Sequence, residues 1–114
     1  MKISYDDHTT LTVLTLSGEL INDQAEALRR TCLDRFATGI RDIVLDLENL
    51  TLIDSAGLET LLWLQDEIKS HLGQLRLVRA DETIRTILRV TRLECSFDLY
   101  DTIESAAKSL RFKS

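Results

Sequence analysis

A serine follows an aspartate at Asp54-Ser55, and this pair is where the chain could carry out chemistry. A serine becomes a catalytic nucleophile when a base lies within hydrogen-bond reach. The Gly-x-Ser-x-Gly motif of hydrolases is absent, and His71 lies 16 residues further along the same expected helix. On a helix that separation is about 24 Å, at ~1.5 Å per residue. His71 therefore cannot activate Ser55, and the sequence favours a binding protein over an enzyme.

Other chemical motifs are equally scarce. No glycine-rich phosphate loop follows a strand-like segment, and no His-rich or closely spaced Cys pattern occurs, so no cofactor and no metal are expected. Cys32 and Cys95 stand alone in apolar surroundings. We interpret both as small buried hydrophobic side chains in preference to a disulfide or a ligand pair.

The Asp54-Ser55 pair lies where an apolar, strand-like stretch turns into a helix. Either residue can cap that helix, which alone would explain the polar pair. Capping does not explain Gly57, because a glycine in the first helical turn costs about 1 kcal/mol relative to alanine. Close packing of the helix on the sheet and open access to the neighbouring hydroxyl are the two explanations that we consider.

Strand-like and helical segments alternate along the chain, and three of the four glycines mark their ends. Strands are expected at 3–5, 11–16, 43–47, 75–78 and 97–100. Helices are expected from Asp23, as N-cap, to Gly39, at 55–72, after Asp81 (with Ile84, Ile87, Leu88 and Thr91 on one face) and at 102–110. The order β-β-α-β-α-β-α-β-α predicts one α/β domain: a mixed, mostly parallel sheet of four to five strands with about four helices.

Length and charge narrow the function. The chain has 114 residues, 44% of them hydrophobic, which suits one domain with one core. Its 19 acidic and 14 basic residues give a net charge of -5, which argues against a nucleic-acid partner. No apolar run approaches the ~18 residues of a membrane span, and the amino terminus turns acidic at once. We therefore expect a cytoplasmic protein without a membrane span.

The motif Asp54-Ser55-Ala56-Gly57-Leu58, placed after the apolar run at 43–47, resembles that of STAS domains, the anti-sigma factor antagonists of bacteria. The Gly18-Glu19-Leu20 end of the second strand, the third helix and the closing segment at 97–101 fit the same layout. The resemblance spans nearly the whole chain and implies a single STAS domain over residues 1–114.

In this family an anti-sigma factor that is also a serine kinase phosphorylates the serine of the motif, and a phosphoserine phosphatase restores it. The resemblance implies that Ser55 is the phosphoacceptor and that the unphosphorylated form binds the anti-sigma factor, which frees a sigma factor. The partner kinase would bind ATP, and this chain is expected to be a monomer or a weak dimer. The expected partner-binding residues are Asp23, Asp54, Ser55, Ala56, Gly57, Glu59 and Trp63.

Three positions depart from the family pattern. Ala56 stands where the best-known members have a second serine, which leaves Ser55 as the one hydroxyl of the motif. Ile21 stands where many members have an aspartate directly after Gly-Glu-Leu, and Asp23 follows two positions later. Arg92 stands where a small residue is common in the third helix.

The physics of a helix start supports the resemblance independently. Unpaired N–H groups and a partial positive charge favour an anion there by about 0.3–1 kcal/mol, while Asp54 would repel it, so phosphorylation should leave the fold unchanged. At a docked interface, two like charges 4 Å apart cost about 4 kcal/mol at an effective dielectric of 20. Since each ~1.4 kcal/mol is tenfold in affinity, phosphorylation could weaken docking roughly a thousandfold.

Two further features have alternative interpretations. Gly57, Leu61, Leu64, Ile68 and Leu72 form the expected buried face of the second helix, with Trp63 beside Ala56, Glu59, Asp66 and Glu67 on the other side. Trp63 is either packed against a neighbouring helix or an exposed anchor for the partner. Likewise Arg85, Arg89 and Arg92 form a basic stripe that is either solvated or a docking patch for an acidic partner.

Two rival functions follow from the same residues. In the first, the chain is a STAS subunit of a phospholipid-transport or signalling scaffold complex, and Ser55 is not phosphorylated. In the second, it is a small enzyme or phosphocarrier, which the scarcity of histidine disfavours. A cognate kinase among the copurifying proteins would separate the leading hypothesis from both.

Overall fold

The sheet at the centre of the molecule has five strands, and the structure, a computed structural model, describes residues 1–111. The strands are β1 (Lys2–His8), β2 (Leu11–Leu20), β3 (Asp42–Ile53), β4 (Leu75–Val78) and β5 (Leu99–Tyr100). The helices are α1 (Gln24–Ala37), α2 (Ser55–Ser70), α3 (Glu82–Val90) and α4 (Ile103–Arg111). The predicted α/β class and the predicted order of elements are both confirmed.

The strands lie in the order β1-β2-β3-β4-β5. β1 pairs with β2 in antiparallel fashion, and each later neighbour pairs in parallel. β1 and β2 therefore form an antiparallel hairpin at the edge of the sheet, and β1 is longer than the predicted segment 3–5. The last strand is shorter than predicted, because a 3₁₀ turn at Glu94–Ser96 precedes it and leaves the buried Phe97 outside the pairing.

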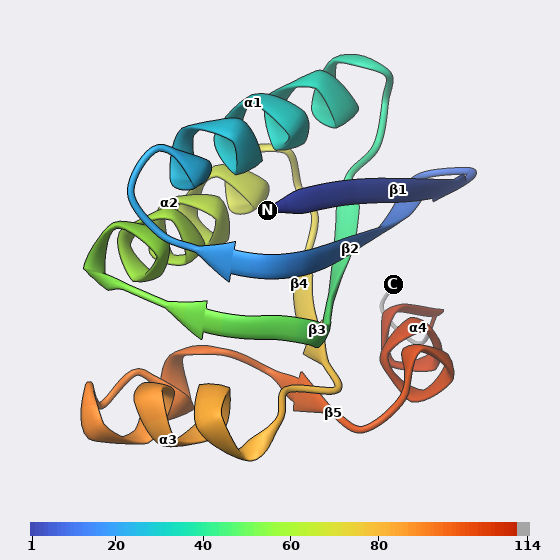
Figure 1. Cartoon of the computed structure of the whole chain (residues 1–114). Helices are drawn as coiled ribbons and strands as arrows, with labels where there is room; N and C mark the ends of the chain where they lie inside the picture. The colour runs from blue at the N-terminus through green and yellow to red at the C-terminus, as the bar shows by residue number, and fades with distance from the viewer. Residues whose placement is uncertain (112–114) are drawn as a thin grey trace.

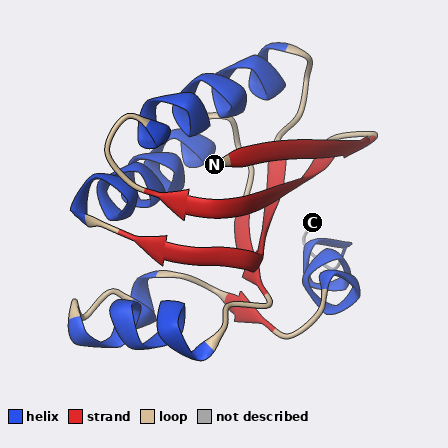
Figure 2. Cartoon of the chain, in the orientation of Figure 1, coloured by secondary structure: helices blue, strands red, loops and turns tan. Residues whose placement is uncertain are grey.

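Helices cover the two faces of the sheet unequally. Figures 1 and 2 show α1, α2 and α3 on one side and α4 alone on the other. The larger core cluster joins the first three helices to the sheet through side chains such as Leu28, Leu64 and Leu88. The cluster beneath α4 has three fully buried members, Val44, Val78 and Ala106. The face that α4 covers thus has the smaller hydrophobic core.

The end of α2 differs from the prediction. The helix ends at Ser70, and Leu72 lies outside it with a φ of 61° and 81% of its surface exposed. Leu72 was expected on the buried face, so that prediction is wrong. Gly73 is buried instead, and a Cβ added to it would collide with the carbonyl oxygen of Arg41. Gly73 therefore allows close packing, and the residue with left-handed backbone angles is Leu72, one position earlier.

Two more predictions fail in part. Cys32 is buried, as predicted for a core side chain, and burial raises the pKa of its thiol to about 12. Cys95 is exposed, because it lies on the 3₁₀ turn that carries it away from the core. On α3, Ile84 and Leu88 are buried as predicted, whereas Thr91 is exposed as the C-cap.

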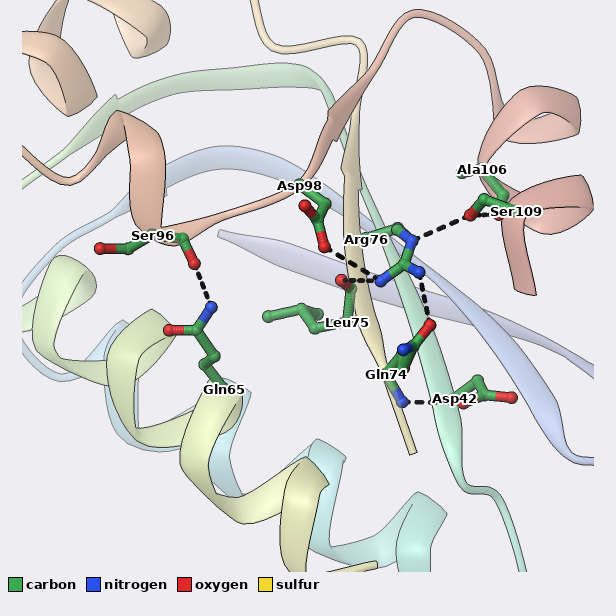
Figure 3. A network of polar contacts seen from close by, with 9 residues as sticks. All are labelled: Asp42, Gln65, Gln74, Leu75, Arg76, Ser96, Asp98, Ala106 and Ser109. Carbon is green, nitrogen blue, oxygen red and sulfur yellow. Dashed lines mark hydrogen bonds and ion pairs between the residues drawn. The ribbon is translucent and has the colours of Figure 1, made fainter. Parts of the chain in front are cut away.

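A network around Arg76 ties α4 to the sheet (Figure 3). Its Nε donates to Ser109 Oγ of α4 at 2.9 Å, and its Nη1 donates to Asp98 Oδ2 at 3.2 Å and to the Leu75 carbonyl at 3.1 Å. Its Nη2 donates to Gln74 Oε1. Arg76 is buried and forms an ion pair with Asp98, so the network fixes the position of α4 on the face with the smaller core.

Candidate functional site

The candidate site is the junction between β3 and α2. Asp54 occupies the N-cap with extended backbone angles, and its Oδ1 accepts a hydrogen bond from the Gly57 N–H at 2.9 Å. Ser55 is the first residue of α2, and it is exposed. The sequence left either residue as the cap. The structure assigns the cap to Asp54 and leaves the Ser55 hydroxyl at the surface.

Asp54 also joins the site to the loop before α1. Its second oxygen, Oδ2, accepts a hydrogen bond from the Asn22 N–H at 3.1 Å, and its own N–H donates to the Leu20 carbonyl at 3.3 Å. The bond from Gly57, with a further contribution from Asn22, outweighs partial desolvation and lowers the pKa of Asp54 below its ordinary value. The carboxylate is therefore ionised at neutral pH and holds two chain segments together.

Gly57 allows this junction to close. A Cβ added at this position would overlap the Leu20 carbonyl oxygen and lie 2.7 Å from Ile53 Cγ1. Of the two explanations that the sequence offered for this glycine, close packing of the helix on the sheet is confirmed. The start of α2 packs directly on the carboxyl end of β2, and this contact fixes the position of Ser55 relative to the sheet.

The other predicted site residues lie either in the loop before α1 or on α2. Asp23 is exposed and follows Asn22, so it lies in the loop that Asp54 holds; at the α1 N-cap position it makes no side-chain capping bond. Glu59 is exposed and Ala56 half-buried, both in the first turns of α2. That these residues contact a partner stays a prediction.

Trp63 lies two turns along α2 and is half-buried. The guanidinium carbon of Arg29, on α1, lies 5.3 Å from the centroid of its ring, and Arg29 Nε donates to Thr60 Oγ1 at 3.4 Å. Trp63 also packs against the larger core cluster. This geometry favours the interpretation in which the tryptophan packs against a neighbouring helix.

The basic stripe on α3 is partly neutralised. Arg85 Nη2 lies 3.5 Å from Asp101 Oδ1, and Arg85 Nε donates to the Ala80 carbonyl at 3.1 Å. Arg89 and Arg92 are exposed. The stripe therefore has two solvated cations and one paired cation. It lies on α3, whereas Ser55 lies at the start of α2.

Sequence reasoning missed Asn22 and Leu52. Asn22 has a φ of 48°, and the Asn-Asp turn dipeptide was the available signal, since asparagine tolerates the left-handed region. Leu52 stands two residues before Asp54 and is 40% exposed, which provides an apolar surface beside the site. Leu52 lies beyond Asp46, the last residue of β3 that pairs with β4.

The described residues 1–111 offer neither a metal site nor a membrane span. No group of three or more His, Cys, Asp and Glu side chains there could hold a metal ion. No helix in that part of the chain has the length and apolar character to cross a membrane.

This arrangement is that of a known family. The STAS domain profile matches residues 2–106, and the chain belongs to the STAS domain family. The family is one of binding modules rather than enzymes.

Its relatives include named antagonists. A Bordetella bronchiseptica protein named "Putative anti-sigma factor antagonist BtrV" is 26% identical over 111 residues, or 97% of this chain and 96% of that protein. The crystal structure of a "putative anti-sigma factor antagonist" from Thermotoga maritima has a TM-score of 0.87 at 26% identity, over 96% of this chain and 94% of that chain. The antagonist SpoIIAA in its unphosphorylated form shares the fold, with a TM-score of 0.82 at 21% identity and 96% of each chain covered. Phosphorylated SpoIIAA, from Bacillus, shares it too, with a TM-score of 0.74 at 22% identity, over 96% of this chain and all of that one.

Proposed function

We propose that this protein is an anti-sigma factor antagonist with Ser55 as its phosphoacceptor. In its unphosphorylated form it binds an anti-sigma factor that is also a serine kinase, and a sigma factor is released. A phosphatase returns the phosphorylated form to the binding pool. Two relatives that carry the antagonist name and a structural neighbour known in unphosphorylated and phosphorylated forms support the proposal.

The observation that carries the proposal is the exposure of Ser55 at the first position of α2. A kinase must place the γ-phosphate of ATP in line with the hydroxyl oxygen, which requires a hydroxyl at the surface. Asp54 caps the helix next to it, so the backbone that presents the hydroxyl is already fixed before a partner arrives. A rigid, accessible serine limits the ordering cost of docking.

The charge of the phosphate explains how binding is switched. A kinase that has just phosphorylated Ser55 holds the remaining phosphates of its nucleotide opposite the new phosphoserine. Two like charges about 4 Å apart repel by about 4 kcal/mol at an effective dielectric of 20, or roughly a thousandfold in affinity. The ionised Asp54 adjacent to Ser55 adds to the negative charge on this side. Repulsion at the interface thus releases the product without a change of fold.

Phosphorylation of the purified chain by its cognate kinase tests the proposal. Incubation with the kinase and ATP should add one phosphate, measured by intact mass, and Ser55→Ala should abolish it. Ser70→Ala is the matched control, because Ser70 is an exposed serine at the other end of the same helix. Phosphate on the Ser55→Ala variant would overturn the assignment of the phosphoacceptor.

Binding to the anti-sigma factor gives an independent measurement. Ser55→Ala should bind with nearly the affinity of the unmodified chain, whereas Ser55→Asp should bind at least about a hundredfold more weakly. Equal affinities for the two variants would contradict the charge mechanism. Tight binding to a partner that neither phosphorylates the chain nor binds a sigma factor would instead support a scaffold or transport subunit.

A further inference from the structure

A groove opens at the end of the molecule away from Ser55. It lies between α4 and the amino-terminal ends of β2 and β3, with a volume of about 770 Å³. Leu11, Val13, Ile103 and Leu110 supply an apolar lining. These side chains are half-buried at the edge of the smaller core cluster, on the face that α4 covers alone. Within the described residues 1–111, the groove is therefore a hollow with an apolar part that no side chain fills.

Leu72 stands at the rim of this groove. It is the most exposed large hydrophobic side chain of the described residues, at 81%, and its φ of 61° is in the left-handed region. A bulky residue is rare in that region, where glycine or asparagine is usual. What distinguishes Leu72 is its place: it is an exposed apolar side chain beside the apolar lining of the groove, where a second surface would cover both.

Two opposite charges line the same groove. Arg41 and Glu104 both contribute to its wall, and neither forms a salt bridge with another residue of the described chain. The neighbouring polar groups differ, since His8 pairs with Asp6, and Asp42 accepts a hydrogen bond from the Gln74 N–H at 2.8 Å. One cation and one anion are thus available on one patch.

We propose that this groove is the interface of a symmetric dimer formed by two copies of the chain. Leu72 of each copy inserts between α4 and the sheet of the other, and Arg41 of each copy pairs with Glu104 of the other. A two-fold interface places the same patch on both subunits, so the patch must carry both members of every contact. A protruding leucine beside a hollow, and a cation beside an anion, meet that requirement.

A second copy suits the groove better than a small molecule. The volume alone would suit either, because ligand sites commonly have about 300–1,000 Å³. A second copy would bring apolar surface against Leu72, which is 81% exposed, and would supply both an anion for Arg41 and a cation for Glu104. The patch is also limited in extent, and interfaces at the lower end of the size range form weak, reversible complexes.

The dimer leaves the Ser55 junction free. Ser55 is the first residue of α2 and Leu72 follows its other end, so the length of a 16-residue helix, about 24 Å, separates them. A dimer through the groove would therefore present two Ser55 sites at its outer ends. Evidence for or against the dimer is thus independent of the proposed function.

Sedimentation velocity over a wide range of chain concentration tests the dimer. We expect a reversible monomer–dimer equilibrium for the unmodified chain. Leu72→Asp should raise the dissociation constant at least about tenfold, because it places a charge in the apolar hollow of the partner. Val90→Asp is the matched control: Val90 is 71% exposed on α3 and outside the groove, so this variant should dimerise as the unmodified chain does.

A charge exchange tests the predicted pairing. Arg41→Glu and Glu104→Arg should each weaken the dimer, because like charges then face each other across the two-fold axis. The double variant should recover most of the lost affinity. Circular dichroism of each variant verifies that the fold is retained.

Three results would overturn the proposal. The first is a monomer at every concentration up to near-millimolar. The second is a Leu72→Asp variant that dimerises as well as Val90→Asp. The third is a double charge variant that is no tighter than either single variant.

Discussion

The carboxylate of Asp54 accepts a hydrogen bond from the backbone N–H of Asn22 at 3.1 Å, across 32 positions of sequence. The same carboxylate caps α2 through Gly57. One side chain therefore fixes both the helix that presents Ser55 and the loop that carries Asp23. This link makes the two parts of the candidate site a single unit.

Replacement of Asp54 by alanine should loosen both segments. Loss of a helix cap together with the Asn22 bond is expected to lower the Tm by several degrees, about 4–8 °C for a domain of this size. The Asn22 amide should also lose its protection, as measured by hydrogen exchange in NMR spectra. Asp81→Ala is the control, because Asp81 caps α3 through the Ile84 N–H at 2.9 Å. That variant should lower the Tm and leave Asn22 protected; equal loss of protection in both variants would refute the link.

Acid should weaken the same unit. The pKa of Asp54 is lowered in the folded chain, so its contribution to stability is complete above the unfolded pKa, near 4, and is lost as the pH falls through the folded pKa. Asp54→Asn removes this dependence. In thermal melts between pH 7 and pH 3, the unmodified chain should therefore lose more of its Tm than Asp54→Asn does. Parallel profiles would show that Asp54 does not titrate differently in the two states.

A side chain at position 57 should strain the junction. In Gly57→Ala the new methyl meets the Leu20 carbonyl, which is backbone and cannot rotate away, and Ile53. Overpacking of this kind costs about 1–3 kcal/mol, measurable by urea unfolding. The control is the reverse substitution one position earlier, Ala56→Gly. It should cost about 1 kcal/mol through helix propensity alone. A Gly57→Ala variant as stable as the unmodified chain would mean that the junction has room.

Much of the fold follows from local sequence. Gly39, with a φ of 100°, follows the end of α1 as predicted, whereas Gly18, with a φ of 103°, lies inside β2, which is longer than predicted and continues to Leu20. The absence of proline and the clear change from strand to helix periodicity gave the order of all nine elements, and a cap at Asp54 or Ser55 was evident from residue type. These features depend on neighbours in the chain, so the sequence suffices to predict them.

The failures depend on contacts between distant segments. The Asn22 bond to Asp54 requires β2 and β3 to be aligned, which residue types do not encode locally. Gly73 was correctly expected near a helix end, yet its role is set by the Arg41 carbonyl, and this moves the left-handed position to Leu72. Cys95 is exposed because it lies on a 3₁₀ turn between α3 and β5 that the sequence did not predict.

Replacement of Leu72 by glycine should stabilise the isolated chain. A non-glycine residue in the left-handed region costs about 1–2 kcal/mol, and the greater freedom of glycine in the unfolded chain offsets part of the gain. A net increase of about 0.5 kcal/mol is expected in urea unfolding at low chain concentration. Gly73→Ala, the adjacent control, should be strongly destabilising, because its methyl would overlap the Arg41 carbonyl. A less stable Leu72→Gly would indicate that the side chain packs within its own chain.

Replacement of Trp63 by alanine distinguishes the two interpretations of that residue. The structure favours packing against α1, so a half-buried indole should contribute about 2 kcal/mol to the free energy of unfolding. A double-mutant cycle with Arg29→Ala should give a coupling of about 0.5–1 kcal/mol, typical of a cation–π pair near the surface. If Trp63→Ala instead left the unfolding curve unchanged and weakened anti-sigma factor binding by about 2 kcal/mol, the tryptophan would be a partner anchor. Because Arg29 covers the ring, we expect the stability effect to be the larger.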